Sequence, residues 1–485
     1  MKEFDEYVEQ TRKAWNVPGV AIAIVKDDKV IYARGFGVLE TGKPDQVDEN
    51  TIFAIGSNTK LFTSTALGML VQEKKLSWDD RITKYLPELE LYDPYVTHQL
   101  TIRDSLSHRS GLGTWAGDLV AWGSRHNRKE LLRRVRYLKP VFPFRSGYGY
   151  SNIMFLAAGE TIPTITGKTW DVFVQERLLN PLAMTRTSLS TIPLANMKNV
   201  AQPHTTDAGK VVIVPWRNLD NIGPAGSINS SVMDMTRWIR MQLNNGTLDG
   251  KRFVDEAILD EIKTPHNSLK VTKASRDLFP SRHFVSYGLG IGVSDLYGKM
   301  VLSHTGGVDG MLSRVMMIPE ERLGLVILTN HDDHSVDTPL YMRVFDSFLG
   351  QPKKDWNIIL LEQQRKQKAE QTKKEQSIAK ARVSETKSTL PIDKYAGHFR
   401  NEHYGDITVV NHGTLQLQLV EHPGIECNLE HWHYDTFLCD WNDVEFGKTL
   451  IQFDIDDSAS VSKVSFKVRE DFIDPLEYVF SRVVA

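Results

Sequence analysis

The sequence has little of three features that define large classes of protein. Two cysteines, Cys427 and Cys439, occur among 485 residues, too few for a disulfide framework. We interpret them as two small buried residues of a protein from a reducing compartment; the alternative is one cross-strand bridge. No run approaches the ~20 consecutive apolar residues that a membrane-spanning helix needs. The formal net charge of −3 gives no reason to expect nucleic acid or an anionic membrane as partner.

The N-terminal residues Met-Lys-Glu-Phe-Asp-Glu-Tyr are too acidic and too poor in apolar side chains for a secretory signal. We therefore expect a cytoplasmic protein, with a secreted protein trimmed of its signal as the alternative. Hydrophobic residues make up 41% and charged residues 25%, as in an ordinary soluble protein. At ~150 residues per domain, the length predicts two or three domains.

Strand patterns occur at both ends of the first part of the chain. Residues 20–25 and 30–37 read as a β-hairpin, and residues 300–304, 313–318 and 325–328 read as further strands. We expect these strands to form one antiparallel sheet. The long middle segment would then be inserted, mostly as helices, because residues 61–71 and 233–243 carry apolar side chains at helical spacing.

The composition changes after residue 350. Residues 362–387 are rich in Gln, Lys, Glu and Ala, as in a solvated helix or linker. Beyond residue 391 short alternating strands predict an antiparallel barrel or sandwich; they are 407–410, 415–420, 436–439, 450–455 and 461–468. We predict three parts: a first domain over 1–352, a charged linker helix over 353–390 and a β-barrel domain over 391–485.

Ser57 and Lys60 form the segment that points most directly to chemistry. Positions i and i+3 of a helix lie on one face, so Lys60 would lie beside Ser57 at the start of the helix at 61–71. A serine hydroxyl becomes a nucleophile when a neighbouring base takes its proton, and a desolvated lysine can be that base. Ser-x-x-Lys also occurs at Ser377, Ser384 and Ser460, but only the copy at Ser57 opens an apolar helix.

Two further motifs distinguish the Ser-x-x-Lys at Ser57 from the other three. Tyr150-Ser151-Asn152 is the only Tyr-x-Asn in the chain. His304-Thr305-Gly306-Gly307 contains its only His-Thr-Gly, and there is no Lys-Thr-Gly. The absence of a Gly-x-Ser-x-Gly elbow argues against an α/β-hydrolase.

The ordered set of three motifs resembles the serine β-lactamase and penicillin-binding-protein superfamily. The segments 78–87, 100–112 and 224–229 resemble its class C-related branch, and the resemblance covers residues 5 to 350. It implies an α/β (α+β) fold: an antiparallel β-sheet flanked by helices, with an all-helical subdomain. The C-terminal part, from Tyr395-Ala-Gly-His-Phe onwards, resembles the lipocalin-like barrel attached to some members of the branch, for which a structural or gating role is expected.

The resemblance implies roles for the motif residues. Ser57 would be acylated, and Lys60 and Tyr150 would handle the protons, without a decision on which is the base. Asn152 would hold Lys60 and the substrate, and the backbone N–H groups of Ser57 and Gly307 would form the oxyanion hole. The implied substrate-binding or oxyanion residues are Asn152, His304, Thr305, Gly306 and Gly307. No cofactor and no metal is expected.

His304 departs from the lactamases of this branch, which usually carry lysine there to bind a substrate carboxylate. A histidine at this position resembles instead some D-alanyl-D-alanine peptidases, D-aminopeptidases and carboxylesterases of the branch. We expect a serine hydrolase that acts on small-molecule esters or peptides. The alternatives are a penicillin-binding protein or weak β-lactamase, acyl transfer to another acceptor, and a non-catalytic scaffold. Assembly into a homo-oligomer is left open. His422, His431 and His433 offer no third ligand at suitable spacing, so we expect no metal there.

Overall fold

A computed structural model describes residues 2–468 and 474–483. The chain forms two compact units, each described by itself below. The first contains Met1–Leu89, Tyr95–Gly111 and Phe142–Glu362, and the second contains Glu90–Pro94, Leu112–Val141 and Gln363–Ala485. The predicted domain boundaries at 352 and 390 stay predictions, and the ends at 1 and 485 lie outside the described residues.

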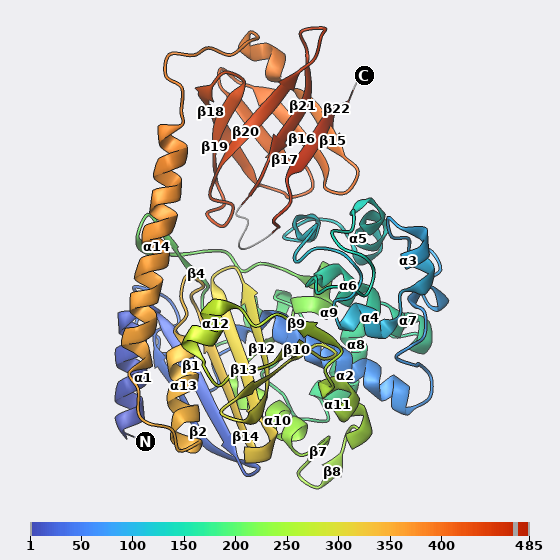
Figure 1. Ribbon diagram of the computed structural model, residues 1–485, viewed down its shortest axis with the longest axis vertical. Coiled ribbons are helices and arrows are strands. Elements are labelled where there is room, and N and C mark those ends of the chain that lie inside the picture. Colours follow the sequence, from blue (N-terminus) through green and yellow to red (C-terminus); the bar gives the residue numbers. More distant parts are fainter. Residues whose placement is uncertain (1, 469–473, 484–485) are drawn as a thin grey trace. The chain divides into compact units, whose positions relative to one another are not determined.

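An eight-stranded antiparallel sheet organises the first unit, in the order β2-β1-β14-β13-β12-β11-β10-β9. Its strands are β1 (Gly19–Lys26), β2 (Lys29–Gly37), β9 (Asn267–Leu269), β10 (Val285–Tyr287), β11 (Gly292–Leu296), β12 (Lys299–Val308), β13 (Met311–Ile318) and β14 (Leu323–Thr329). The N-terminal hairpin pairs directly with β14, so the prediction of one sheet from both ends of the segment is confirmed (Figure 1).

The central strands are apolar because both faces of the sheet are covered. All seven residues of β14 are buried, as are seven of the eight in β1. The helix α10 (Val232–Leu243) packs on β14 and β1. A separate cluster joins the sheet to α1 (Lys2–Ala14) and α13 (Asp337–Phe348), with Ile22, Ile318 and Phe345 among its members. A strand buried on both faces reads as a continuous apolar run rather than an alternating one.

Helices make up most of the inserted middle segment, as predicted. They are α2 (Thr59–Gln72), α3 (Pro94–Gln99), α4 (Ile102–Leu106), α5 (Arg128–Arg134), α6 (Asn152–Gly159), α7 (Thr161–Thr166), α8 (Trp170–Val174), α9 (Gly223–Gly226), α11 (Glu256–Lys263) and α12 (Lys273–Leu278). Short strand pairs lie between them: β3 (Phe53–Ala54) with β6 (Asn229–Ser230), β4 (His204–Asp207) with β5 (Lys210–Ile213), and β7 (Thr247–Leu248) with β8 (Lys251–Arg252). Every residue of α2 from Thr59 to Leu70 is buried, which makes it the central helix of this part.

The second unit contains a closed antiparallel β-barrel. Its strands are β15 (Gly397–Asn401), β16 (Gly405–Asn411), β17 (Leu415–Leu419), β18 (Glu426–His433), β19 (Thr436–Trp441), β20 (Lys448–Ile455), β21 (Val461–Phe466) and β22 (Tyr478–Arg482). Alternate residues along β17 and β20 are buried, as expected where one face lines a small barrel. Aromatic rings fill the interior: Tyr395 lies 5.3 Å from Phe437 and 5.1 Å from Phe453 between ring centroids. Sequence patterns predicted five of the eight strands and missed β15, β18 and β22.

The two cysteines form a disulfide, so our interpretation of them as separate buried residues is wrong. Cys427 on β18 and Cys439 on β19 have Cα atoms 5.6 Å apart. The strands pair Cys427 with Trp441 and Leu429 with Cys439, which places the two cysteines on neighbouring diagonal positions. Disulfides persist in oxidising surroundings, and the argument for a reducing compartment therefore loses its basis.

The inserted segment Leu112–Val141 belongs to the second unit because its backbone is bonded to the loops of the barrel. The two ring nitrogens of His403 each lie 3.0 Å from a carbonyl oxygen, those of Gly117 and Arg134. His422 Nε2 donates to the carbonyl of Leu119 at 2.8 Å. A barrel loop thus supplies hydrogen-bonding partners that this irregular segment needs when its backbone is buried.

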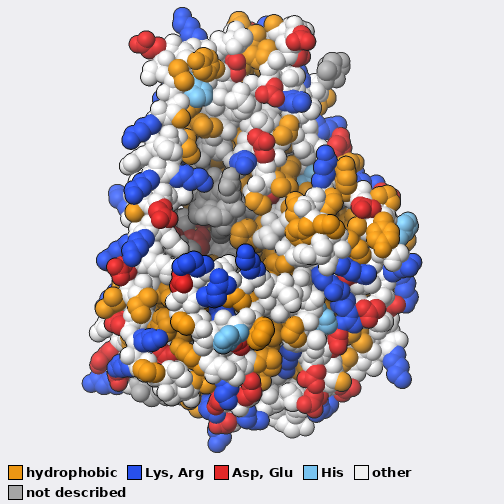
Figure 2. Space-filling view, viewed as in Figure 1, with side chains coloured by type: hydrophobic (Ala, Val, Ile, Leu, Met, Phe, Trp, Pro, Cys, Tyr) orange, Lys and Arg blue, Asp and Glu red, His pale blue; other side chains and the backbone are white. Residues whose placement is uncertain are grey.

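The charged linker is a single helix for most of its length, α14 (Trp356–Lys380), and Trp356 and Leu360 at its start are buried. Lys, Arg, Asp and Glu side chains are interspersed over the face of the molecule shown in Figure 2, in line with the small net charge. In the described part of the chain, no helix is both long and apolar enough to span a membrane.

Candidate active site

Ser57 lies in a short 3-10 turn, Gly56–Asn58, that leads directly into α2. Gly56 has φ +49°, a left-handed conformation that glycine adopts at no steric cost. Side chains brace the turn from the sheet: Asn58 Nδ2 donates to Ser313 Oγ at 2.7 Å, and Ser313 Oγ donates to the carbonyl of Ile55 at 2.7 Å. The serine is half-buried, so its hydroxyl is held at a fixed position and remains accessible.

Lys60 is completely buried, one helical turn beyond Ser57. Its Nζ lies 3.0 Å from Ser57 Oγ, 2.6 Å from Asn152 Oδ1 and 2.8 Å from the carbonyl oxygen of Ala225. The same atom lies 4.7 Å from the centroid of the Tyr150 ring. A buried amine is stable only where polar partners replace water, and these contacts provide them.

Tyr150 and Asn152 reach this lysine from the start of α6. Ser151 caps the helix by accepting from Met154 N, and its own N–H donates to His108 Nδ1 at 3.0 Å. The ring of His108 is buried, and its centroid lies 4.4 Å from that of the Tyr150 ring. The imidazole therefore packs against the tyrosine ring. Burial, together with the charge of Lys60, holds the pKa of His108 well below its usual range.

The strand β12 carries His304, Thr305, Gly306 and Gly307 along the other side of the serine turn. The two backbones lie very close: a Cβ added at Gly56 would lie 2.8 Å from Gly307 N, and one added at Gly306 would lie 1.9 Å from the carbonyl oxygen of Ile55. Only glycine permits this approach. The structure therefore brings together all three motifs, which are far apart in the sequence.

His304 has a hydrogen-bonding partner that the sequence analysis missed. Its Nε2 lies 2.8 Å from the hydroxyl of Tyr287 on β10, and its Nδ1 lies 2.5 Å from the carbonyl oxygen of Thr305. Burial and then the charge of Lys60 lower the pKa of His304 to about 3. Tyr287 and the carbonyl of Ala225 belong to no motif that we recognised; the one signal was that Ala225 falls in a segment of the family resemblance.

Other residues singled out from the sequence lie elsewhere. His431 Nε2 donates to the carbonyl of Tyr434, and His433 Nδ1 accepts from Val383 N. No group of three His, Cys, Asp or Glu side chains that could hold a metal occurs among residues 2–468 and 474–483.

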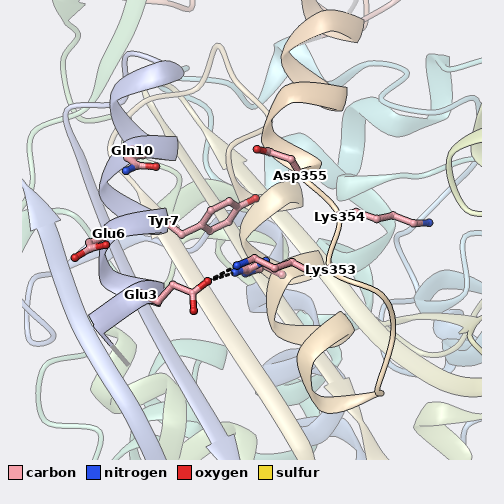
Figure 3. A pocket seen from close by; sticks show the side chains of 8 residues that line it. Glu3, Glu6, Tyr7, Gln10, Lys353, Lys354 and Asp355 are labelled. Carbon is pink, nitrogen blue, oxygen red and sulfur yellow. Dashed lines mark hydrogen bonds and ion pairs between the residues drawn. The ribbon is translucent and has the colours of Figure 1, made fainter.

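A surface pocket lies in the first unit, beside α1 and the chain just before α14, and none of the candidate catalytic residues lines it. Figure 3 shows Glu3 pointing toward Lys353, with which it forms an ion pair, and the ring of Tyr7 above them in this view. Glu3 also pairs with Arg343 at 2.8 Å. These ion pairs connect α1 with α13 and with the segment that follows it. We therefore interpret the charged residues of this pocket as structural.

Models of two protein families match the chain. The family model "Beta-lactamase" matches residues 4–346, and the model "Domain of unknown function (DUF3471)" matches residues 381–478. The curated protein "Unguisins hydrolase ungD" of Aspergillus violaceofuscus is 29% identical over 385 residues, which are 73% of this chain and 65% of that protein. "Protein flp" of Staphylococcus aureus (strain COL) is 24% identical over 68% of this chain and 63% of its own length. The chain thus spans slightly less than two thirds of the length of each of these two relatives.

Two solved structures have the same fold. The octameric penicillin-binding protein homologue from Pyrococcus abyssi matches with a TM-score of 0.65 and 21% identity, over 99% of each chain. The D-stereospecific amidohydrolase from a Streptomyces species matches with a TM-score of 0.57 and 23% identity, over 72% of this chain and 99% of its own. The first match covers both units, so the combination of a helix-flanked antiparallel sheet with a C-terminal barrel occurs in another protein.

Proposed function

The chain belongs to the Beta-lactamase family, and we propose that it is a serine hydrolase that cleaves ester or amide bonds through an acyl-enzyme formed at Ser57. The observation that carries the proposal is the position of Lys60. Its buried Nζ lies 3.0 Å from Ser57 Oγ and is anchored by Asn152 and by the carbonyl of Ala225. A scaffold protein would have no need of a buried lysine aimed at a half-exposed serine.

The anchors favour Lys60 as the base in acylation. An uncharged amine has two N–H groups and one lone pair. Asn152 Oδ1 and the carbonyl oxygen of Ala225 can only accept, so in the uncharged form of Lys60 they can take its two N–H groups, and the lone pair is then available to the proton of Ser57 Oγ. The hydroxyl proton moves to Nζ as Oγ attacks the substrate carbonyl.

The remaining steps use groups on either side of the serine. The backbone N–H groups of Ser57 and Gly307 stabilise the oxyanion, since the turn and β12 are in contact there. Tyr150 gives its proton to the leaving alkoxide or amine and regains one from Lys60, so the charge balances as the bond to the leaving group breaks. Water then attacks the ester at Ser57, and the same groups return the proton to Oγ.

For the substrate, we propose uncharged esters and small amides, including amides of D-amino acids. The amide reading is supported by the structural neighbour described as a D-stereospecific amidohydrolase and by a relative named as a hydrolase. Slow acylation by penicillins, without release, would instead place this chain with penicillin-binding proteins. Assembly into a homo-oligomer is compatible with the octameric homologue, and we propose no particular number of subunits.

The first experiment is intact-protein mass after exposure to a fluorophosphonate. Wild type should gain one adduct, and Ser57→Ala should gain none. Ser377→Ala is the matched control, because Ser377 also precedes a lysine by three residues but lies on the exposed face of α14; it should label as wild type does. A folded wild type without an adduct, or an adduct that persists in Ser57→Ala, would overturn the proposal. A panel of esters, D-amino-acid amides and β-lactams then separates the substrate classes.

A further inference from the structure

The hydrogen bond between Tyr287 and His304 defines the electrostatic character of the site. We propose that Tyr287 is a positioning residue that keeps His304 an uncharged imidazole, and that the site therefore favours substrates whose leaving group carries no carboxylate. The inference rests on the proposed function and adds to it a class of substrate. It concerns residues on β10 and β12, and neither the family resemblance nor the comparisons assign a role to Tyr287.

The hydrogen-bond partners determine which nitrogen of His304 carries the proton. Nδ1 lies 2.5 Å from the carbonyl oxygen of Thr305, which can only accept, so Nδ1 must donate. In an uncharged imidazole Nε2 is then the acceptor, and the hydroxyl of Tyr287 at 2.8 Å must be its donor. Both nitrogens are engaged, which leaves no N–H of His304 for a substrate anion.

The surroundings oppose a charge on either partner. Two cationic side chains act on His304 and disfavour a positive charge there: Lys60, once it has taken the proton of Ser57, and Arg314. Burial comes first among the causes that lower the pKa of His304. Burial likewise raises the pKa of Tyr287 well above its ordinary value, helped by Tyr150 and Tyr148, so its hydroxyl remains a donor at neutral pH.

The two nearby cations are also engaged. Arg314, the strand neighbour of Thr305, forms an ion pair with Asp337 at 2.7 Å. Lys60 is held between Ser57, Asn152 and Ala225, as described above. A substrate carboxylate that enters this region would lose water without gaining a charged partner, which is costly.

The leaving group is the part of the substrate that faces His304. Tyr150, which protonates the leaving group in the proposed mechanism, has its ring 6.2 Å from that of His304 between centroids. A charge on the leaving group would therefore lie close enough to His304 to interact with it, whereas a charge at the far end of the acyl chain would lie farther away.

The test compares two aryl esters of N-acetylglycine with equal size, one with a meta-carbamoyl and one with a meta-carboxylate group on the phenol. We expect the uncharged ester to have kcat/KM at least ~10-fold higher, since an unpaired anion at a desolvated site is rejected. The ratio should stay constant between about pH 6 and pH 8. A preference for the carboxylate ester, or a ratio that moves toward it as the pH falls, would show a charged His304 and overturn the inference.

Variants then separate positioning from packing. Tyr287→Phe should remove the donor to His304 Nε2, which ¹⁵N NMR of labelled histidine would show as a shift of the Nε2 signal while Nδ1 stays protonated, and should lower kcat/KM for the uncharged ester about 2- to 10-fold. Tyr148→Phe is the matched control: its ring lies 5.7 Å from that of Tyr287, and it should keep the wild-type tautomer and ratio. Unchanged histidine signals in Tyr287→Phe would refute the positioning role.

Replacement of His304 itself provides a second readout. His304→Lys should shift the ratio toward the carboxylate ester by about 10-fold, because a cation is then present. His304→Asn is uncharged and should keep the wild-type preference. It is the control that separates the effect of a positive charge from the effect of replacing the histidine. A collapse of the preference in His304→Asn would contradict the inference. Absence of any turnover or adduct at Ser57 in wild type would refute the proposed function instead, so the two failures are distinguishable.

Discussion

Replacement of Gly306 by alanine tests whether close contact between β12 and the serine turn is needed for catalysis. A Cβ at this position would lie 1.9 Å from the carbonyl oxygen of Ile55 and 2.5 Å from Ser313 Oγ. Ordinary contacts of this kind exceed ~3.2 Å, so the strand and the turn must separate by roughly 1 Å. The backbone carbonyl of Ile55 immediately precedes the turn that holds Ser57 and cannot rotate out of the way.

The size of the effect follows from that displacement. A shift of about 1 Å in a catalytic group costs on the order of 100-fold in rate. Here it would move the N–H of Gly307 away from the oxyanion, and loss of one such donor costs ~100- to 1000-fold in kcat. We therefore expect Gly306→Ala to lower kcat on an activated ester by about 100-fold or more.

Gly307→Ala is the matched control in the next residue. Its added Cβ would meet only Leu312 Cδ2, at 3.3 Å, the end of a flexible side chain, and its backbone N–H is retained. We expect a loss of less than about 5-fold. Steady-state kinetics, with circular dichroism to verify folding, decides the matter. A folded Gly306→Ala enzyme within a few-fold of wild type, or a Gly307→Ala enzyme equally impaired, would refute the reasoning.

Two further predictions concern buried polar groups. Burial raises the pKa of Asp474 to about 7 although Tyr404 donates to it, so the folded unit binds more protons than the unfolded chain between about pH 4 and pH 7. Stability from this group is therefore present at low pH and lost as the pH rises through 7, by on the order of 2–4 kcal/mol. Asp474→Asn should flatten that dependence in urea unfolding at pH 5 and pH 8; an unchanged slope would contradict the assignment. Asn152→Leu removes the acceptor 2.6 Å from Lys60 Nζ and should slow fluorophosphonate labelling of Ser57 about 10- to 100-fold, as measured by time-resolved mass spectrometry. Labelling at the wild-type rate would mean that Asn152 does not orient the lysine.

Local patterns in the sequence predicted the parts of this protein that depend on local physics. Short apolar runs and stretches of alternating residues identified the strands that became β1, β2, β13 and β14, because the side chains of a strand record which of its faces pack on a core. Helical spacing placed Lys60 beside Ser57, since positions i and i+3 are neighbours in any helix. The His-Thr-Gly segment was found as a motif, and its glycines do lie where two backbones touch.

Tertiary structure alone decided the contacts between distant segments. Tyr287 lies in no motif, and only the pairing of β10, β11 and β12 brings its hydroxyl to His304. The disulfide between Cys427 and Cys439 required the register of β18 on β19. The grouping of Leu112–Val141 with the barrel depends on hydrogen bonds to His403 and His422, residues that follow it by most of the chain. A sequence records which side chains prefer burial, but which buried groups meet is determined by chain topology, and topology depends on the packing of the whole unit.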